Sequence, residues 1–292
     1  MKFLLATLLL ALAHGSIAQD DAFRVLVNKG QNAIRTGGSW TPVKIGAVLQ
    51  TRDLVRVAPN GYLGLVHVSG KPLELKEAGE FAVADLAGQI KAGPGVMSKY
   101  TDFILSREAE TSTNLVVTGA VHRGNEELVL FLPDARKAVF LSDDLAITWS
   151  AVPGAQHYVV QFSSMFGDPL HRVETSDTAV VVNLNAEKFK EEDNIITEVF
   201  VRDNPQKRSD PSMIKKVSPA DRKRINAALE EVKAETLSES ALSSLLRAAF
   251  YEEHGLLIDA ATAYRMAAAA EPGVPQYREA YLAFLRRQAA VE

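Results

Sequence analysis

The sequence contains no cysteine. This absence excludes disulfide bonds, a catalytic thiolate, cysteine-ligated zinc and iron–sulfur clusters. It also excludes the lipid anchor of bacterial lipoproteins, because that anchor is attached to a cysteine. If the chain is exported, its stability must therefore come from a buried apolar core rather than from cross-links.

Metal-ligand spacing is also missing. No two histidines stand at i, i+3 or i, i+4, and no H-E-x-x-H segment occurs, so the sequence gives a metal site no support. The histidines are His14, His67, His122, His157, His171 and His254. The acidic groups Asp20-Asp21, Asp143-Asp144 and Glu191-Glu192-Asp193 lack the alternate ligand spacing and the glycine of a calcium loop. We interpret them as solvated loops.

Catalytic motifs are equally scarce, since no G-x-S-x-G elbow occurs. The stretch from Gly64 to Lys71 resembles a P-loop only loosely, because five residues rather than four separate Gly64 from Gly70. Pro72 also occupies the position of the Ser or Thr that would hold magnesium. We interpret this stretch as a tight turn between strands, and we expect no catalytic centre, no cofactor and no metal.

The chain has no excess of positive charge. It holds 32 Lys and Arg against 36 Asp and Glu, a formal net charge of −4. Mild acidity with both signs mixed is typical of a solvated surface and gives no reason to expect nucleic acid as a partner.

Long apolar runs are confined to the first eighteen residues. Lys2 gives a positive start, Phe3 to Ala13 is apolar, and Ser16-Ile17-Ala18 places small residues at a cleavage site. A run of about 11 apolar residues is too short to span a bilayer, which needs roughly 20 helical residues. We expect a signal peptide cleaved after Ala18, no membrane span, and export to the periplasm or the outer membrane; an uncleaved anchor is the alternative.

Residues 19–90 show a strand rhythm. Apolar pairs at i, i+2 follow the period of a pleated strand, and turn formers such as Pro59-Asn60-Gly61 separate them, which favours a sandwich or barrel over βαβ units. The pairs are Val25/Val27, Val43/Ile45, Val55/Val57, Leu73/Leu75 and Phe81/Val83.

This stretch resembles the FecR-like domain of bacterial envelope proteins. The matching residues are Gly30, Trp40, Gly46, Leu49, Asp53, Val55, Asn60-Gly61, Ser69-Gly70, Leu73-Glu74-Leu75 and Gly79. The resemblance implies sensing or binding at the envelope. The best-known members carry a cytoplasmic segment and a membrane helix before this domain, whereas here only a signal peptide precedes it. We therefore do not expect signalling to a sigma factor.

Residues 91–132 form a connection of mixed character. Ser98 is the expected cap of a helix to about Glu110, with Tyr100, Phe103 and Ile104 on one face. Leu115–Val117 and Leu128–Leu132 are expected strands. The sequence leaves open whether this connection belongs to the domain before it or to the one after it.

Residues 133–217 have a second strand rhythm, at residues 138–141, 146–149, 158–162, 179–182 and 195–201. Ile147-Thr148-Trp149, Pro153-Gly154-Ala155 and Tyr158-Val159-Val160 resemble the start of a fibronectin type III domain. The resemblance implies a sandwich in which Trp149 packs in the core opposite Tyr158. Trp40 and Trp149 are also the residues able to stack on sugars; we favour the core for Trp149 and leave both roles open for Trp40.

Residues 218–292 read as helical. Ser218-Pro219-Ala220-Asp221 combines an N-cap, Pro at the first helical position and an acid in the first turn. Thr236-Leu237-Ser238-Glu239 fits a capping box, and its helix should stop at Gly255.

The segment from Ala241 to Val274 resembles one tetratricopeptide repeat, and residues 275–288 read as a capping helix. The matches are Ala248, Tyr251, Ala260, Tyr264, Ala267 and Pro272, while Ser244 and Arg247 depart from the pattern. Tyr251, Tyr264 and Leu246 should pack inside this unit.

The expected fold is multi-domain, with mainly β structure in the N-terminal two-thirds and an all-α helical-repeat tail. The order is a signal peptide (1–18), a FecR-like β domain (19–90), a helix-plus-strand connection (91–132), a fibronectin type III-like sandwich (133–217) and a tetratricopeptide-like helical domain (218–292).

We expect a non-enzymatic adaptor or scaffold of the bacterial envelope that docks a protein partner through its C-terminal helices. Because the stretch from Asn204 to Pro211 is polar and loop-like, the helical tail should stand apart, and deleting Ala241–Glu292 should leave the β domains folded. The alternative is a glycan- or peptidoglycan-binding module that works through the β domains.

Overall fold

The computed structural model describes residues 21–90, 95, 97–113, 128–133, 138–236 and 239–289. The expected signal peptide and the expected strand at Leu115–Val117 lie outside the described residues. The described strands all lie between Asp21 and Lys216, and four of the described helices follow from Pro219. The expected fold class, mainly β and then all-α, is confirmed.

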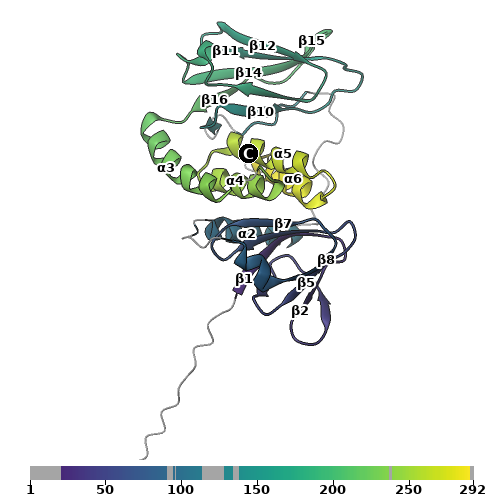
Figure 1. Cartoon of the computed structure of the whole chain (residues 1–292). Coiled ribbons are helices and arrows are strands. Elements are labelled where there is room, and N and C mark those ends of the chain that lie inside the picture. The colour runs from purple at the N-terminus through teal and green to yellow at the C-terminus, as the bar shows by residue number, and fades with distance from the viewer. Residues whose placement is uncertain are drawn as a thin grey trace, which may run out of the picture.

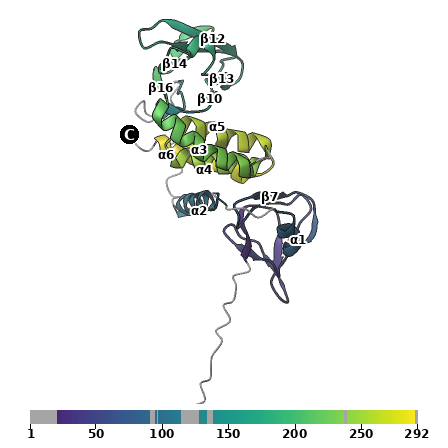
Figure 2. The ribbon, with the colours of Figure 1, turned by 60° about the vertical axis from the view of Figure 1, so that its left-hand side comes forward.

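Three layers make up the molecule. A first β module (residues 21–90) and a second β module (residues 138–217) lie on opposite sides of the C-terminal helices in both views (Figures 1 and 2). We call these helices, residues 219–289, the helical layer.

The first β module consists of two antiparallel sheets, with strand orders β4-β1-β6-β7 and β3-β2-β5-β8. Its elements are β1 (Asp21–Lys29), β2 (Ala33–Arg35), β3 (Trp40–Pro42), β4 (Val48–Gln50), β5 (Leu54–Val57), β6 (Tyr62–His67), β7 (Pro72–Leu75), β8 (Gly79–Ala82) and helix α1 (Val83–Gly88). Many of their side chains, including Phe23, Leu49, Val55 and Leu63, form an apolar core inside the module. Other side chains of β1 and β6, such as Val27 and Tyr62, pack against the helical layer instead.

Two of the expected strand pairs are wrong in this module. Val43 and Ile45 lie in the connection between β3 and β4, where Gly46 takes a φ of 82° and its N–H donates to Val25 O. Val43 is buried because this connection folds over the core of the module, and not because it alternates with its neighbours in a strand. Val83 begins helix α1. Strand β6 was not predicted from the sequence, because its first five residues are all buried and so show no alternation of apolar and polar residues.

Only the later part of the Gly64–Lys71 stretch is the expected turn, because the stretch begins inside β6. Gly64 lies within β6, and Gly70 (φ 88°) makes the turn into β7. A Cβ on Gly70 would lie 2.8 Å from Met97 Cβ, so the turn also needs a residue without a side chain.

Helix α2 (Ser98–Thr113) packs on the helical layer. Ser98 is its first helical residue rather than the expected cap, because Met97 O accepts from Thr101 N and so precedes the first turn. Further along, the expected strand Leu128–Leu132 reduces to a single bridge between Leu130 and Trp149. Leu128, Leu130 and Leu132 pack into the second β module. The connection is thus divided between two layers.

The second β module packs a two-stranded sheet, β10-β13, against a sheet of order β12-β11-β14-β16-β9 in which β15 also pairs with β14. The elements are β9 (Val139–Phe140), β10 (Asp144–Thr148), β11 (Tyr158–Ser163), β12 (Pro169–Thr175), β13 (Ala179–Asn183), the 3-10 turn η2 (Glu187–Phe189), β14 (Asn194–Val201), β15 (Asn204–Arg208) and β16 (Ser212–Lys216). Trp149 is 2% exposed and packs edge-on against Tyr158 with ring centroids 5.6 Å apart, so its core position is confirmed.

The helical layer contains α3 (Pro219–Glu235), α4 (Ala241–Glu253), α5 (Leu257–Ala270) and α6 (Pro275–Ala289). Ser218 caps α3, with Pro219 at its first position, as expected. The expected capping box is wrong: Thr236 ends α3 by donating to Val232 O, and Ser240 is the residue that caps α4. Gly255 (φ 71°) separates α4 from α5 as expected.

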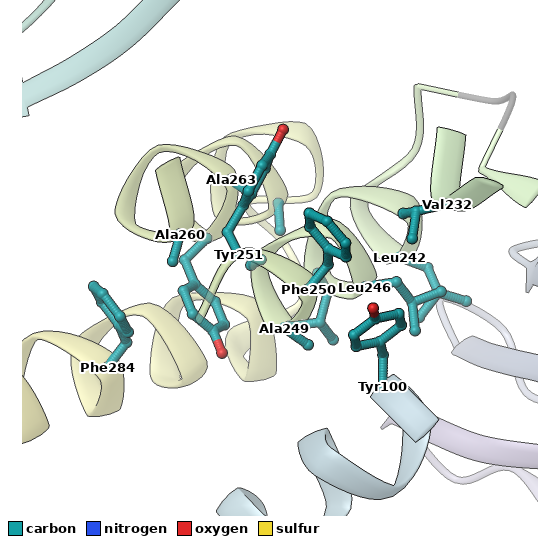
Figure 3. Packing of buried hydrophobic residues seen from close by; sticks show 14 of the residues in the cluster. Tyr100, Val232, Leu242, Leu246, Ala249, Phe250, Tyr251, Ala260, Ala263 and Phe284 are labelled. Atoms are coloured by element: carbon teal, nitrogen blue, oxygen red, sulfur yellow. The ribbon is translucent and has the colours of Figure 1, made fainter. Parts of the chain in front are cut away.

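The helices and the first β module share one apolar core. Tyr251, Tyr264 and Leu246 are buried within the layer, as expected. The same cluster also contains Val27 and Tyr62 from the first module and Tyr100 from α2. Figure 3 shows Tyr100 directed at Phe250 and Leu246 of α4. The apolar core of the layer therefore continues into the first β module and α2.

Candidate functional site

Polar contacts fix the first β module to the helical layer. The Glu74 carboxylate of β7 accepts a hydrogen bond of 2.8 Å from Leu242 N at the start of α4, where unpaired N–H groups favour an anion. Burial raises the pKa of Glu74, but the hydrogen bonds from Leu242 and Lys76 outweigh burial and hold the net pKa below its ordinary value. The hydroxyls of Tyr62 and Tyr277 meet at 2.6 Å, and Lys76 pairs with Glu271.

A second set of contacts joins the layer to the second β module. Asp259 of α5 accepts hydrogen bonds from Leu141 N at 2.9 Å and Ser142 N at 2.7 Å. Thr262 accepts one from Ala146 N at 3.0 Å. Asp259 is 1% exposed, and burial raises its pKa although its hydrogen bonds act in the opposite direction.

These two sets of contacts overturn the expectation that the tail stands apart. The stretch expected to be a flexible link, Asn204 to Pro211, contains β15, which pairs with β14. We use the term helical clasp for the layer together with its contacts through Glu74, Tyr277, Asp259 and Thr262. The clasp holds the two β modules in one arrangement.

The first candidate binding surface is the outer face of the β3-β2-β5-β8 sheet. Arg35 lies directly opposite Trp40, and Arg56 lies opposite Glu80. The guanidinium carbons of Arg56 and Arg35 lie 4.0 Å and 5.0 Å from the centroid of the Trp40 ring. The sequence singled out Trp40, but nothing in it indicated the two arginines.

The second candidate surface is the turn between β11 and β12, which sequence analysis missed. Phe166 is 92% exposed and Met165 is 56% exposed. Ser164 Oγ accepts hydrogen bonds from Phe166 N and Asp168 N, and Ser164 N donates to Asp168 O. The apolar pair is therefore held out by an ordered turn, which we call the Phe166 apex. An apolar pair inside a Ser-Met-Phe-Gly-Asp turn was the available signal.

A groove beside β1 is less promising. It has a volume of about 190 Å³, below the 300–1,000 Å³ or so of ordinary ligand sites. Its walls mix apolar and charged side chains: Asp21, Phe23, Arg24, Val48, Val66, His67, Val68, Ser98, Thr101 and Asp102. Arg24 and Asp102 already pair across it at 2.9 Å.

Three histidines serve packing. His67 lies edge-on to Phe23, while His171 and His254 stack on Phe162 and Phe250. Burial lowers the pKa of His67 and of His171. Within the described residues, no group of three or more His, Cys, Asp or Glu could hold a metal ion.

Comparison of the sequence with protein-family models and with curated proteins found no match. Among the described helices, none combines the length and apolarity that a bilayer crossing requires.

Proposed function

We propose that this chain is a non-enzymatic adaptor of the bacterial envelope. The observation that carries the proposal is the helical clasp, which ties both β modules to one set of helices through buried polar contacts. Buried polar contacts fix an arrangement more strictly than apolar contacts do, because each donor must meet its acceptor. Such a body is suited to holding two different surfaces at a set distance. Export is part of the proposal because residues 1–18 have the sequence pattern of a signal peptide.

The Phe166 apex is the surface that supports a protein partner. Aromatic and methionine side chains are enriched at the centres of protein interfaces and supply most of their binding energy. Burying one Phe side chain stabilises a protein or complex by about 1.5–3 kcal/mol. Because Phe166 is almost fully exposed in the chain alone, most of this stabilisation would come from binding a partner. The ordered turn also lowers the entropy lost on binding.

The C-terminal helices are the other surface for a protein partner. Their exposed large apolar residues are Met266 (42%) and Leu282 (39%). Both are less exposed than Phe166, and the opposite sides of the layer already contact the β modules. The apex is therefore the better-supported docking site.

Site-specific photo-crosslinking in cells tests the adaptor function. The crosslinking residue replaces Phe166, Leu282 or, as a matched control, Val181, which is 56% exposed on β13 of the same module as the apex. We expect one envelope protein to be captured from position 166 and not from 181. Capture from 282 alone would move docking to the helices. Capture from neither position would refute the adaptor function.

A second candidate function is glycan binding through the Trp40 face, and the aromatic ring on an outer sheet face favours it. The test is a pull-down on purified sacculi. Trp40→Ala should reduce retention, whereas Trp149→Phe should not, because Trp149 is buried. Equal retention of the wild type and Trp40→Ala would contradict this function.

A further inference from the structure

The Trp40 face presents a cation, Arg35, whose guanidinium N–H groups have no partner among the described residues. Arg56 donates through Nε and Nη2 to one oxygen of Glu80, at 3.0 and 2.7 Å. Arg35, by contrast, has no ion pair or side-chain hydrogen bond to any described residue. Its guanidinium group makes a cation–π contact with the Trp40 ring. A guanidinium carries five N–H donors in a planar fork that matches a carboxylate.

The sheet itself keeps this guanidinium on the outer face. Arg35, Trp40 and Arg56 share a face because opposed residues and i, i+2 residues lie on the same side of a sheet. The other face carries Ile34, Val55 and Phe81 into the core. The aromatic contact limits the movement of the arginine, so less entropy is lost when it binds an anion.

Charge on the wider surface also favours an acidic ligand. Residues 21–90 hold eight Lys and Arg against six Asp and Glu, whereas residues 138–217 hold eight against twelve. The first β module is thus positive within a chain that is negative overall. An acidic ligand would be drawn to this module rather than to the second one.

We propose that Arg35, positioned by Trp40, binds the carboxylate of an acidic glycan. This inference rests on the glycan-binding candidate function. Among the described residues, β2, β3, β5 and β8 carry no exposed large apolar side chain. A protein interface needs an apolar centre within roughly 800 Å² per partner. A face with one aromatic ring and two guanidinium groups fits a short charged sugar segment better.

The experiment compares polymers that differ in one property. Polygalacturonate carries a carboxylate on each sugar, its methyl ester has the same backbone without the charge, and polyglutamate has the charge without the sugar. Binding of the full mature chain is measured at low and high salt by biolayer interferometry. The variants are Arg35→Gln, at a partly exposed arginine, and, as a control with the same charge change, Arg52→Gln, at an exposed arginine of the same module.

We expect polygalacturonate to bind about tenfold or more tightly than its ester, and Arg35→Gln to remove that difference. Arg52→Gln should change affinity less than about twofold, and high salt should weaken binding. Thermal melting should be the same for both variants and the wild type.

Each other outcome overturns the inference in a distinct way. Equal binding of polygalacturonate and its ester would leave glycan binding intact and refute the role of Arg35. Equal binding of polyglutamate would assign the site to acidic peptides. Equal losses in Arg35→Gln and Arg52→Gln would show non-specific attraction. Binding to none of the polymers would refute the acidic-glycan site, and the sacculus test decides the glycan function separately.

Discussion

Replacing Asp259 with alanine should loosen the contact between the helical layer and the second β module. Asp259 is the acceptor for Leu141 N and Ser142 N. The variant removes both acceptor oxygens beside Leu141, which is 3% exposed. One buried N–H and one half-buried N–H then lose their partners.

The expected cost follows from these two donors. A buried donor left without a partner costs about 1–3 kcal/mol, and a half-buried one costs less because water can reach it. Removing the carboxyl group offsets part of this loss of stability, since burial disfavours the ionised carboxylate of Asp259. We therefore expect Asp259→Ala to lower the free energy of unfolding by about 2–4 kcal/mol.

The same residue predicts a dependence on pH. Burial raises the pKa of Asp259 above its ordinary value of 3.8, so the folded chain binds this proton more readily than the unfolded chain. The stabilisation from that proton is complete below the unfolded pKa and is lost as the pH rises through the folded pKa. Asp259→Asn has no such proton. The wild type should therefore lose stability relative to Asp259→Asn as the pH rises.

Urea unfolding of the wild type and both variants, followed by circular dichroism, checks these expectations between about pH 4.5 and 7.5. The difference between the wild type and Asp259→Asn isolates this carboxyl, because all other titrating groups are common to both. A difference that stays constant with pH would refute the raised pKa. An alanine variant as stable as the wild type would show that the two amides do not depend on Asp259.

Three further predictions concern the core, the clasp and export. Trp149→Ala should cost about 3–5 kcal/mol in urea unfolding; a neutral effect together with lost binding would make Trp149 a surface residue. Deleting Ala241–Glu292 should unfold the first β module, because Val27 and Tyr62 lose their cover. A protease-resistant fragment of residues 21–90 would contradict this and restore the independent tail. Mass spectrometry of the natural protein should find a chain beginning at Gln19, and a full-length species held in the inner membrane would favour the uncleaved anchor.

Local hydrogen bonding explains which structural features could be predicted from the sequence. Ser218-Pro219 marks a helix start because both residues act on the first turn of that helix. Gly255 marks a helix end through its own backbone conformation. Edge and fully buried strands were harder to predict: β6 has no alternation, while β12 and β15 are polar segments ordered by their neighbours.

The candidate surfaces depended on contacts between distant residues. Trp40 could be singled out as one of two tryptophans, but its arginine neighbours come from β2 and β5 and meet it only through sheet register. Phe166 has no signal in the sequence beyond its place in the Ser-Met-Phe-Gly-Asp segment. Its exposure results from the turn that Ser164 and Asp168 impose.

By itself the sequence determined the order of β and helical regions and some helix ends, such as those at Ser218 and Gly255, because these follow from residue periodicity and from groups within a few positions of each other. Only the tertiary structure decided that the helices lie between the two β modules. Asp259 meets Leu141 N across 118 positions and Glu74 meets Leu242 N across 168. Such pairs form only when the surfaces of separate modules pack together. A single buried carboxylate adds no periodic pattern to the sequence, so the sequence does not predict its partner.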